Sequence, residues 1–490
     1  MAGVITSTAN RTGSAASAAP RSGQYLVVGQ TERGPLDPTV VTSLAQFAEL
    51  FGERVTYGFL TDDLTVYFRE GGARAIVKRV VGPAATTGTL TLKDAATTPA
   101  NAIRVDATSP GAWSSSVSVS IVAGALAGTV TLAVYRAGLL VERYSNLATN
   151  AALADAVSRS ALIRVTDLGG ALPAATPLPG SGPNIGTALS AGSDDRASVT
   201  TARLTGSAGL GALTRDLGVG AVAIPGYTAD LVAGALIQHG LDNRRKPLLV
   251  VDVAATQADA RNAAQGLLSA TGYNAHVLWP WVQVPGPGAV PLTVPPTGYV
   301  AAARSKAHAQ VGPWRVPAGT LSTAAYVLGV VGGVLAEADA KALDDAHVSV
   351  IRQLSSTVQL QGYRSLSTNE TTYRLGNIAD ATNSAVEEME ALLFDDLWGN
   401  VDSGGAFYTT VSAKLIGYLD PIRSAGGLFP LVGADGDRLD PGYKVVMDAS
   451  NNTVATLALN AVYAEVGLRW SPVAEFIYLR VTTVGIDAAF

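Results

Sequence analysis

Two kinds of apolar pattern alternate through the first quarter and the middle of the chain. Short continuous apolar runs, typical of strands buried on both faces, lie at 25–29, 75–81, 221–224, 248–253, 275–279 and 299–302. Longer segments with apolar positions three and four residues apart predict helices at 44–51, 64–70, 229–239, 257–271 and 321–336. Ser43 precedes the first helix as an N-cap and Gly52 ends it. Between residues 192 and 361 this alternation predicts a parallel or mixed sheet covered on both faces.

The pattern changes between residues 86 and 183. Short runs of alternating apolar and polar residues at 89–92, 103–105, 117–122 and 130–135 are separated by Gly, Pro and Ser. Such runs predict a small β-sandwich or barrel. The stretch 168–183 is dense in Gly and Pro, which predicts a long exit loop.

The last quarter of the chain predicts helices at 385–398 and 408–425, a strand at 442–448, and two further strands at 459–467 and 475–481. Pro472 has no amide hydrogen, so it separates the last two strands or lies on an edge. A strand so close to the last residue needs a partner sheet. That sheet could belong to its own domain, or to a neighbouring molecule through β-augmentation.

The first 23 residues form a low-complexity arm of Ala, Ser, Thr and Gly. Only Val4, Ile5 and Thr6 have strand character in it. Two interpretations stay open: a disordered terminus, or an extended arm that becomes ordered on a neighbouring molecule.

Motifs in this order resemble those of the contractile-tail sheath family. Gly467–Ile477 reads GLRWSPVAEFI. It is similar to the closing signature of that family, V-G-x-x-P-x-x-P-A-E-F-[IV], with Val473 in place of the second proline. The family comprises the sheaths of contractile phage tails, pyocins and related injection systems.

Further family motifs occur upstream at ordered spacing. Gly34 and Pro35 close a G-x-x-x-x-G-P motif. The other matches are Phe68, Gly71 and Gly72 in F-F-x-x-G-G, Pro313, Trp314 and Pro317 in GPWRVPAG, and Gly362–Leu366 in G-x-R-T-L. The chain departs from the family at the amino terminus, where Gly3-Val4-Ile5 replaces P-G-V-Y-V, and at 377–380, where the family's arginines are missing.

The resemblance implies a multidomain protein of the α/β plus β class. The expected parts are an extended arm (1–23), the N-terminal part of the α/β core (24–82), an inserted β-sandwich or barrel (83–191), a subtilisin-like α/β sheath domain without catalytic residues (192–361), and a C-terminal sheath domain (362–490). The last is expected to be an α+β core completed by the N-terminal segment. Only the insertion lacks specific family motifs.

The same resemblance implies a structural subunit of a contractile phage tail sheath. Copies would polymerise around the tail tube and contract to drive the tube through the host envelope. Neighbours would be linked by exchanged terminal strands that contain Val4, Ile5, Thr6, Glu475, Phe476, Ile477, Tyr478 and Leu479. The implied partners are other copies, the tail tube protein, and baseplate and tail terminator proteins. The implied location is the virion tail, assembled in the host bacterial cytoplasm.

Composition narrows the alternatives. The chain has no cysteine, which argues against thiolate chemistry, and it has four histidines. Its net charge of −5 argues against a protein that binds along a nucleic-acid backbone. No G-x-S-x-G, P-loop or H-E-x-x-H motif is present, so we expect no enzyme and no cofactor. The apolar run 326–336 is shorter than the roughly 20 residues of a membrane span, so no membrane role is expected. Another self-assembling shell or surface-layer protein, or a hydrolase on the α/β domain, remains the alternative.

Two acidic stretches have open interpretations. Glu387, Glu388 and Glu390 lie on one predicted helix, where they either face solvent or meet a basic patch on an inner tube. Asp435–Asp440 is either an ordinary turn or a loop that offers oxygens to Ca²⁺.

Overall fold

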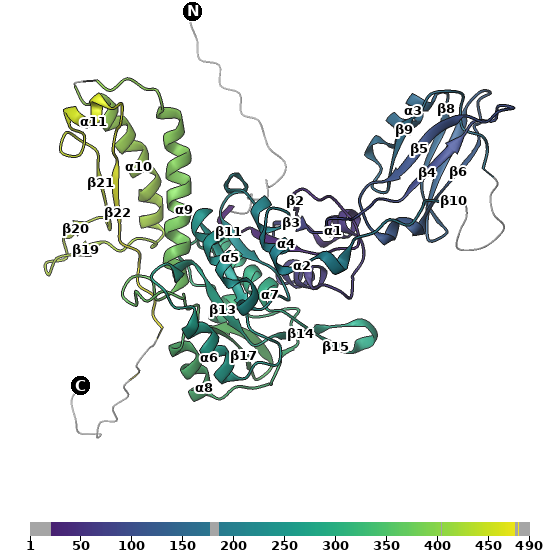
Figure 1. Ribbon diagram of the computed structural model, residues 1–490. Coiled ribbons are helices and arrows are strands. Elements are labelled where there is room, and N and C mark those ends of the chain that lie inside the picture. Colours follow the sequence, from purple (N-terminus) through teal and green to yellow (C-terminus); the bar gives the residue numbers. More distant parts are fainter. Residues whose placement is uncertain (1–20, 177–185, 403, 476–478, 480–490) are drawn as a thin grey trace, which may run out of the picture. The chain divides into compact units, whose positions relative to one another are not determined.

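The computed structural model describes residues 21–176, 186–402, 404–475 and 479 (Figure 1). Their contacts divide the chain into two compact units. The first unit contains the described residues up to Gln310 together with Pro317–Ala379. The second contains Val311–Val316 and the described residues from Asp380 onward.

The first unit is built on an eight-stranded mixed sheet of described residues, in the order β18-β17-β13-β12-β11-β1-β3-β2. The central strands are parallel: β1 (Tyr25–Gly29), β3 (Ala75–Arg79), β11 (Gly220–Ala223), β12 (Arg245–Val250), β13 (His276–Trp279) and β17 (Val348–Leu354). The edge strands β2 (Thr39–Val41) and β18 (Thr357–Gln361) are antiparallel to their neighbours. The sheet is mixed, as predicted for residues 192–361, and it also contains the strands β1, β2 and β3 from residues 24–82.

Alternate side chains of β1 enter different layers. Leu26 and Val28 belong to a core shared with α5 (Ala229–Asp242), α6 (Gln257–Gly266) and α8 (Glu337–Asp345). Tyr25, on the other face, packs against Tyr67 of α2 (Leu60–Arg69) with the two rings tilted by 41°, and α2 packs on α7 (Thr297–Gln310). The helix α1 (Leu44–Phe51) begins as predicted, because the Ser43 side chain accepts the amide of Gln46. Both faces of the sheet are therefore covered.

The described residues between 89 and 188 form two further sheets around a core of their own. One sheet contains β4 (Thr89–Lys93), β5 (Asn101–Ala107) and β9 (Ile163–Asp167). The other contains β10 (Thr187–Ala188), β6 (Val117–Ala123), β7 (Val130–Arg136) and β8 (Leu139–Leu147). Side chains from both sheets, including Ile103, Val105, Ile121 and Leu132, meet in one buried cluster. The alternating runs predicted β4 to β7, but not β8, β9 or α3 (Asn150–Ala156).

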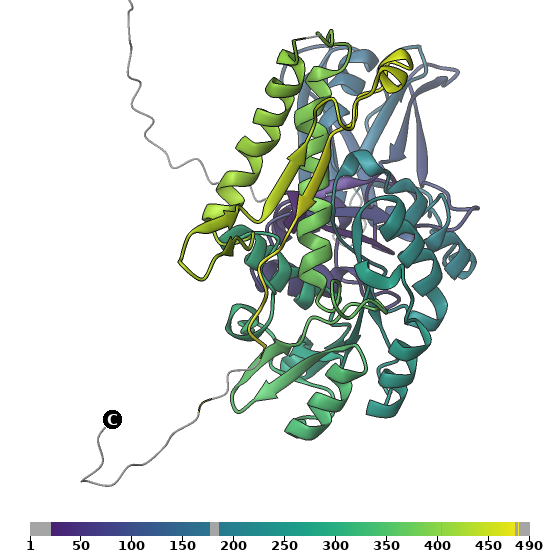
Figure 2. The same cartoon turned by 90° about the vertical axis from the view of Figure 1, so that its left-hand side faces the viewer.

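The second unit is a helical hairpin with β-ribbons. The helices are α9 (Gly376–Leu393), which begins in the first unit, and α10 (Ala406–Ser424). The antiparallel ribbon of β21 (Tyr443–Val446) and β22 (Glu465–Leu468) lies along this hairpin (Figure 2). A smaller ribbon joins β19 (Leu431–Val432) to β20 (Arg438–Asp440), and a short helix α11 (Val454–Ala458) precedes β22.

One predicted strand is wrong, because residues 299–302 lie inside α7. Most of this helix is buried all round, so its apolar residues form a continuous run rather than a stripe. A continuous run of that kind does not distinguish a buried helix from a buried strand. Asp63 also contributes to the start of α7, since its carboxylate accepts the amide of Gly298.

The predicted helix at 321–336 is also wrong. This stretch contains a 3-10 turn, the short strand β16 (Gly329–Val330) and loops, and Gly332 and Gly333 have left-handed φ angles of 86° and 74°. β16 joins the hairpin of β14 (Val282–Pro285) and β15 (Pro291–Val294). Glycine and β-branched residues disfavour the helix that the apolar spacing suggested.

Several element boundaries also differ from prediction, among them the start of α2 at Leu60 rather than 64 and the span of β12, Arg245–Val250 rather than 248–253. The predicted strand at 459–467 is confirmed only from Glu465 to Leu468. α6 ends at Gly266, before the predicted residue 271. α9 spans Gly376–Leu393 rather than 385–398.

Candidate assembly surfaces

The β21–β22 ribbon has two open edges. Its register pairs Tyr443 with Leu468 and Val446 with Glu465, and no other strand of the described residues joins it. A two-stranded ribbon is marginally stable by itself, and its outer edges present unpaired amide and carbonyl groups. These edges are suited to accept further strands.

One face of the ribbon is held by the helical hairpin. Ala385 and Met389 of α9 and Val411 and Leu415 of α10 form a buried cluster with Met447, against which Val445, Val466 and Leu468 pack. The closing signature continues this packing, because the Trp470 indole nitrogen donates to the Thr382 hydroxyl at 3.0 Å. The helical hairpin therefore holds one face of the ribbon in place, while no described strand pairs with the two outer edges.

The Trp314 ring leaves no room for a side chain at two positions of the second unit, both of which are glycine. A Cβ atom at Gly312 would lie 2.4 Å from the Trp314 ring, and one at Gly427 would lie 2.7 Å from it. Trp314 packs beside Leu419, Ile422 and Leu428. Pro313 is half-buried, and Pro317 is buried in the first unit. The P-W-x-x-P motif thus contributes to packing in both units.

The predicted exchange residues fall mostly outside the described residues. Val4, Ile5, Thr6, Phe476, Ile477 and Tyr478 lie there. Glu475 and Leu479 are described, lie in neither helix nor strand, and are both exposed, Leu479 to 86%. Strand exchange through these residues stays a prediction.

The acidic residues predicted to face a tube lie on α9. Glu388 and Glu390 are exposed and Glu387 is half-buried. Burial, and after it the charge of Glu388, raises the pKa of Tyr418 on α10 to about 12. Glu388 is therefore exposed to solvent and also lies close enough to α10 for its charge to act on Tyr418.

An apolar end of α9 was missed by the sequence analysis. Phe394 is 71% exposed, Leu397 60% and Trp398 100%. This stretch was treated as part of a helix and only its acidic residues were weighed, although the apolar side chains of F-D-D-L-W were visible in the sequence. Exposed tryptophan and phenylalanine side chains commonly anchor interfaces.

The glycine–proline motif at Gly34 and Pro35 forms a buried anchor for the 89–188 region. Gly34 has a φ angle of 114°, its amide donates to the Ser109 hydroxyl at 2.9 Å, and an added Cβ would lie 2.6 Å from Phe51. The buried Arg79 donates to the carbonyl oxygens of Gly34 and Pro110. Glu32 and Arg136 add an ion pair at 2.8 Å. The motif therefore connects the α/β sheet to the two β-sheets.

Phe68, Gly71 and Gly72 form a second packing motif. Phe68 contacts Tyr67 edge-on at 5.1 Å, Gly71 has a φ angle of 95°, and a Cβ atom at Gly72 would lie 2.4 Å from the Tyr67 ring. These residues serve the turn from α2 into β3.

The histidines are engaged in structural contacts. His276 is buried, stacks on Tyr363 at 4.1 Å, and its Nδ1 contacts the Arg364 carbonyl oxygen at 2.7 Å. Burial, followed by the charge of Arg245, lowers the pKa of His239 to about 4. His308 contacts the Ser22 hydroxyl at 3.1 Å, but both residues are more than nine-tenths buried. A substrate could not reach that Ser–His pair without local opening.

Within the described ranges, no group of three or more His, Cys, Asp or Glu side chains is arranged to hold a metal ion. In the Asp435–Asp440 turn, Asp440 binds Arg469 through contacts of 2.7 and 3.0 Å. The hydrogen bond from Arg469, followed by that from the Gly442 amide, lowers the pKa of Asp440. No helix in the described part of the chain is both long and apolar enough to cross a membrane.

Comparison with known proteins identifies the fold. No protein-family model and no curated protein matches the sequence. A sheath tail protein of Listeria innocua aligns with a TM-score of 0.61 at 12% identity, over 87% of this chain and 88% of that one. A sheath tail protein of Desulfitobacterium hafniense aligns with a TM-score of 0.58 at 11% identity, over 92% and 94%. A chain of the contracted helical sheath of the anti-feeding prophage aligns with a TM-score of 0.54 at 15% identity, over 99% of both chains. This chain has the fold of contractile-tail sheath proteins, which confirms the resemblance of its motifs.

Proposed function

We propose that this chain is a structural subunit of a contractile phage tail sheath, which polymerises around the tail tube and contracts to drive the tube through the host envelope. The observation that carries the proposal is the shared fold over 99% of the chain with a subunit of a contracted helical sheath. Heterologous contacts that do not close generate helical assemblies of this kind. Besides other copies, the partners would be the tail tube protein and the baseplate and tail terminator proteins. The particle would be assembled in the host bacterial cytoplasm.

The open β21–β22 edges support linkage of neighbours by strand exchange. Terminal segments of adjacent copies would add to the ribbon and keep subunits connected while their folded bodies move. The free energy for contraction would come from new interfaces between subunits rather than from nucleotide hydrolysis. This role agrees with a sequence that has no P-loop.

Electron microscopy of the purified full-length protein tests the proposal. We expect hollow tubes of one diameter, alone or around the tube protein. Flat sheets or closed shells would instead support a surface-layer or shell protein. Hydrolysis of peptide or ester substrates at an enzymatic rate, abolished by His308→Ala, would support the hydrolase alternative.

A further inference from the structure

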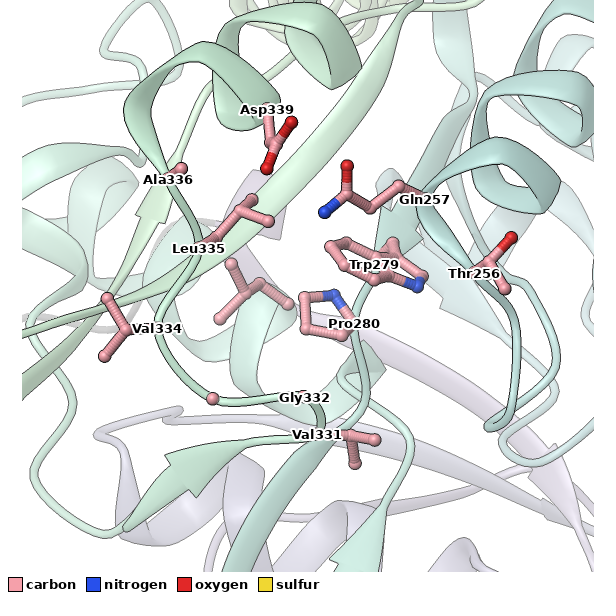
Figure 3. A pocket seen from close by; sticks show the side chains of 12 residues that line it. Thr256, Gln257, Trp279, Pro280, Val331, Gly332, Val334, Leu335, Ala336 and Asp339 are labelled. Carbon is pink, nitrogen blue, oxygen red and sulfur yellow. The ribbon is translucent and has the colours of Figure 1, made fainter.

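A groove of about 450 Å³ opens at the carboxyl end of β13, between the N-terminal turns of α6 and α8 (Figure 3). Its apolar lining includes Trp279, Pro280, Val331, Leu335 and Ile351. Ligands of α/β sheets commonly bind outside the carboxyl ends of the strands.

The apolar lining is fixed before any partner binds. Ile351 is 1% exposed and Trp279 9% exposed, and the Trp279 indole nitrogen donates to the Ala255 carbonyl oxygen at 3.1 Å. Gly332 and Gly333 shape the adjoining loop, in which Val334 is 71% exposed at the lip. Little ordering of the groove would accompany binding.

Two polar side chains point into the groove. Figure 3 shows the carboxylate of Asp339, from α8, and the amide of Gln257, from the first residue of α6, directed into the space beside the Trp279 indole. Neither side chain has a hydrogen bond or ion pair to another described residue. Other acidic groups of α8 are matched: Glu337 pairs with Arg352 at 2.8 Å, and Asp345 pairs with Lys341 at 2.5 Å.

The charge of the groove selects a cation. Each helix N-terminus contributes about half a positive charge, which would by itself favour an anion. However, Asp259 lies in the first turn of α6 and Asp339 in that of α8, no Lys, Arg or His lines the groove, and Glu337 does not count because Arg352 already matches its charge. The carboxylates therefore outweigh the helix ends.

We propose that the groove receives an arginine side chain of a second copy of this chain. The aliphatic stem would lie on the apolar lining, while the planar guanidinium would donate to Asp339 and to the carbonyl oxygen of Gln257. That the occupant is a second copy rests on the proposed function, in which neighbours meet through unlike surfaces. The chain offers exposed arginines outside residues 83–190, such as Arg315, which makes no ion pair within the described ranges.

A cross-linking experiment tests the occupant. The chain contains no cysteine, so Val334→Cys introduces a single attachment site for a thiol-reactive benzophenone at the lip of the groove. Tubes assembled from equal amounts of ¹⁴N- and ¹⁵N-labelled protein should yield mixed-isotope cross-links to an arginine-containing peptide. Val290→Cys, exposed to 67% on the β14–β15 turn, is the control for non-specific labelling. Cross-links within one copy only, or the same peptide from both sites, would overturn the proposal.

A matched pair of variants tests the charge. Asp339→Asn should raise the critical concentration for tube assembly by about threefold to fivefold, as expected for a pair worth up to about 1 kcal/mol, and less at high salt. Asp345→Asn removes the same charge from the same helix outside the groove and should have no such effect. Equal assembly of the two variants would contradict the groove while leaving the sheath proposal intact.

A binding assay on the unassembled chain separates the groove from the proposed function. With 5-fluorotryptophan incorporated, N-acetyl-arginine-amide should shift the ¹⁹F signal that Trp279→Phe removes, and Asp339→Asn should abolish the shift. The uncharged citrulline analogue is the control. An unchanged Trp279 signal, or an equal shift with citrulline, would refute the guanidinium site even if tubes form.

Discussion

Asp63 is a carboxylate buried between β1, α2 and α7. It accepts hydrogen bonds from the Tyr25 hydroxyl at 2.6 Å, the Gly298 amide at 2.7 Å and the Thr297 hydroxyl. Burial raises its pKa to about 6, although these hydrogen bonds oppose the shift. At the residue scale, this side chain therefore makes the stability of the α/β sheet depend on pH.

The sign of that dependence follows from linkage. Because the folded-state pKa lies above the usual value of 3.8, the folded chain holds the Asp63 proton more tightly than the unfolded chain. The contribution to stability is full below about pH 4 and is lost as pH rises through 6. We expect the free energy of unfolding of the wild type, relative to Asp63→Asn, to fall by roughly 2 kcal/mol between pH 4 and pH 7. Urea denaturation of both proteins measures this difference, and parallel pH profiles would contradict it.

Arg79 is a second residue whose contribution to stability can be measured by substitution. Its side chain is fully buried, and its guanidinium donates to Asp194 and Pro110, both at 2.9 Å. Lysine has no planar fork and would leave carbonyl oxygens unmatched. We expect Arg79→Lys to lower the free energy of unfolding by about 2–4 kcal/mol in chemical denaturation. Arg104→Lys, in an exposed ion pair with Asp106, should cost less than about 1 kcal/mol. Equal losses of unfolding free energy in the two variants would show that the hydrogen bonds of the buried Arg79 guanidinium are not the cause.

At the element scale, the sequence predicted five of the eight described strands of the α/β sheet, β1, β3, β11, β12 and β13, because each contains a continuous apolar run. It missed β17 and the edge strands β2 and β18, which are short or carry polar residues among the apolar ones. It failed at α7 because a helix buried all round has no stripe. It failed at 321–336 because apolar spacing was given more weight than Gly332 and Gly333. β8 was missed because it is largely exposed, so no buried face produces an alternating pattern.

The candidate surfaces were predicted unevenly for a related reason. The acidic residues of α9 could be identified from the sequence, because a charged side chain is recognisable without knowledge of its neighbours in the fold. The open ribbon edges and the groove at Asp339 depend on segments far apart in the chain. No local pattern could bring Gln257, Trp279 and Asp339 together.

The acidic side of α9 yields a prediction about the tube. Reversal of Glu387, Glu388 and Glu390 to lysine should weaken co-assembly with the tube protein, most strongly at low salt, while polymers of the chain alone persist. Co-sedimentation with tube protein at several salt concentrations measures this. Reversal of Asp435 and Asp437, exposed on the β19–β20 turn, is the control. Unchanged binding to the tube would indicate that the α9 residues simply face solvent.

At the scale of the whole molecule, residues 83–190 are predicted to be dispensable for tube formation and to face outward. The ends of this region meet, because Gly82 donates to the Asp194 carbonyl oxygen at 2.8 Å and Thr86 pairs with Ser193. A short Gly/Ser linker can therefore replace the region. We expect the shortened chain to form tubes in electron micrographs. Its stability should be lower, because Arg79 loses its hydrogen bond to the Pro110 carbonyl oxygen. A folded chain that forms no tubes would contradict this prediction.

The last prediction concerns the terminal arm. Deletion of residues 1–23 would also remove Ser22 and Gly23, which pack on α7 in contact with His308 and Ser305. Deletion of residues 1–20 avoids this loss of buried contacts and tests the arm alone. If strand exchange links the subunits, the shortened chain should stay monomeric, with circular dichroism and a melting temperature close to those of the full chain. Ile477→Pro, which removes one donor from the predicted last strand, should weaken assembly less severely. Normal tubes without the arm would show that other contacts link the subunits.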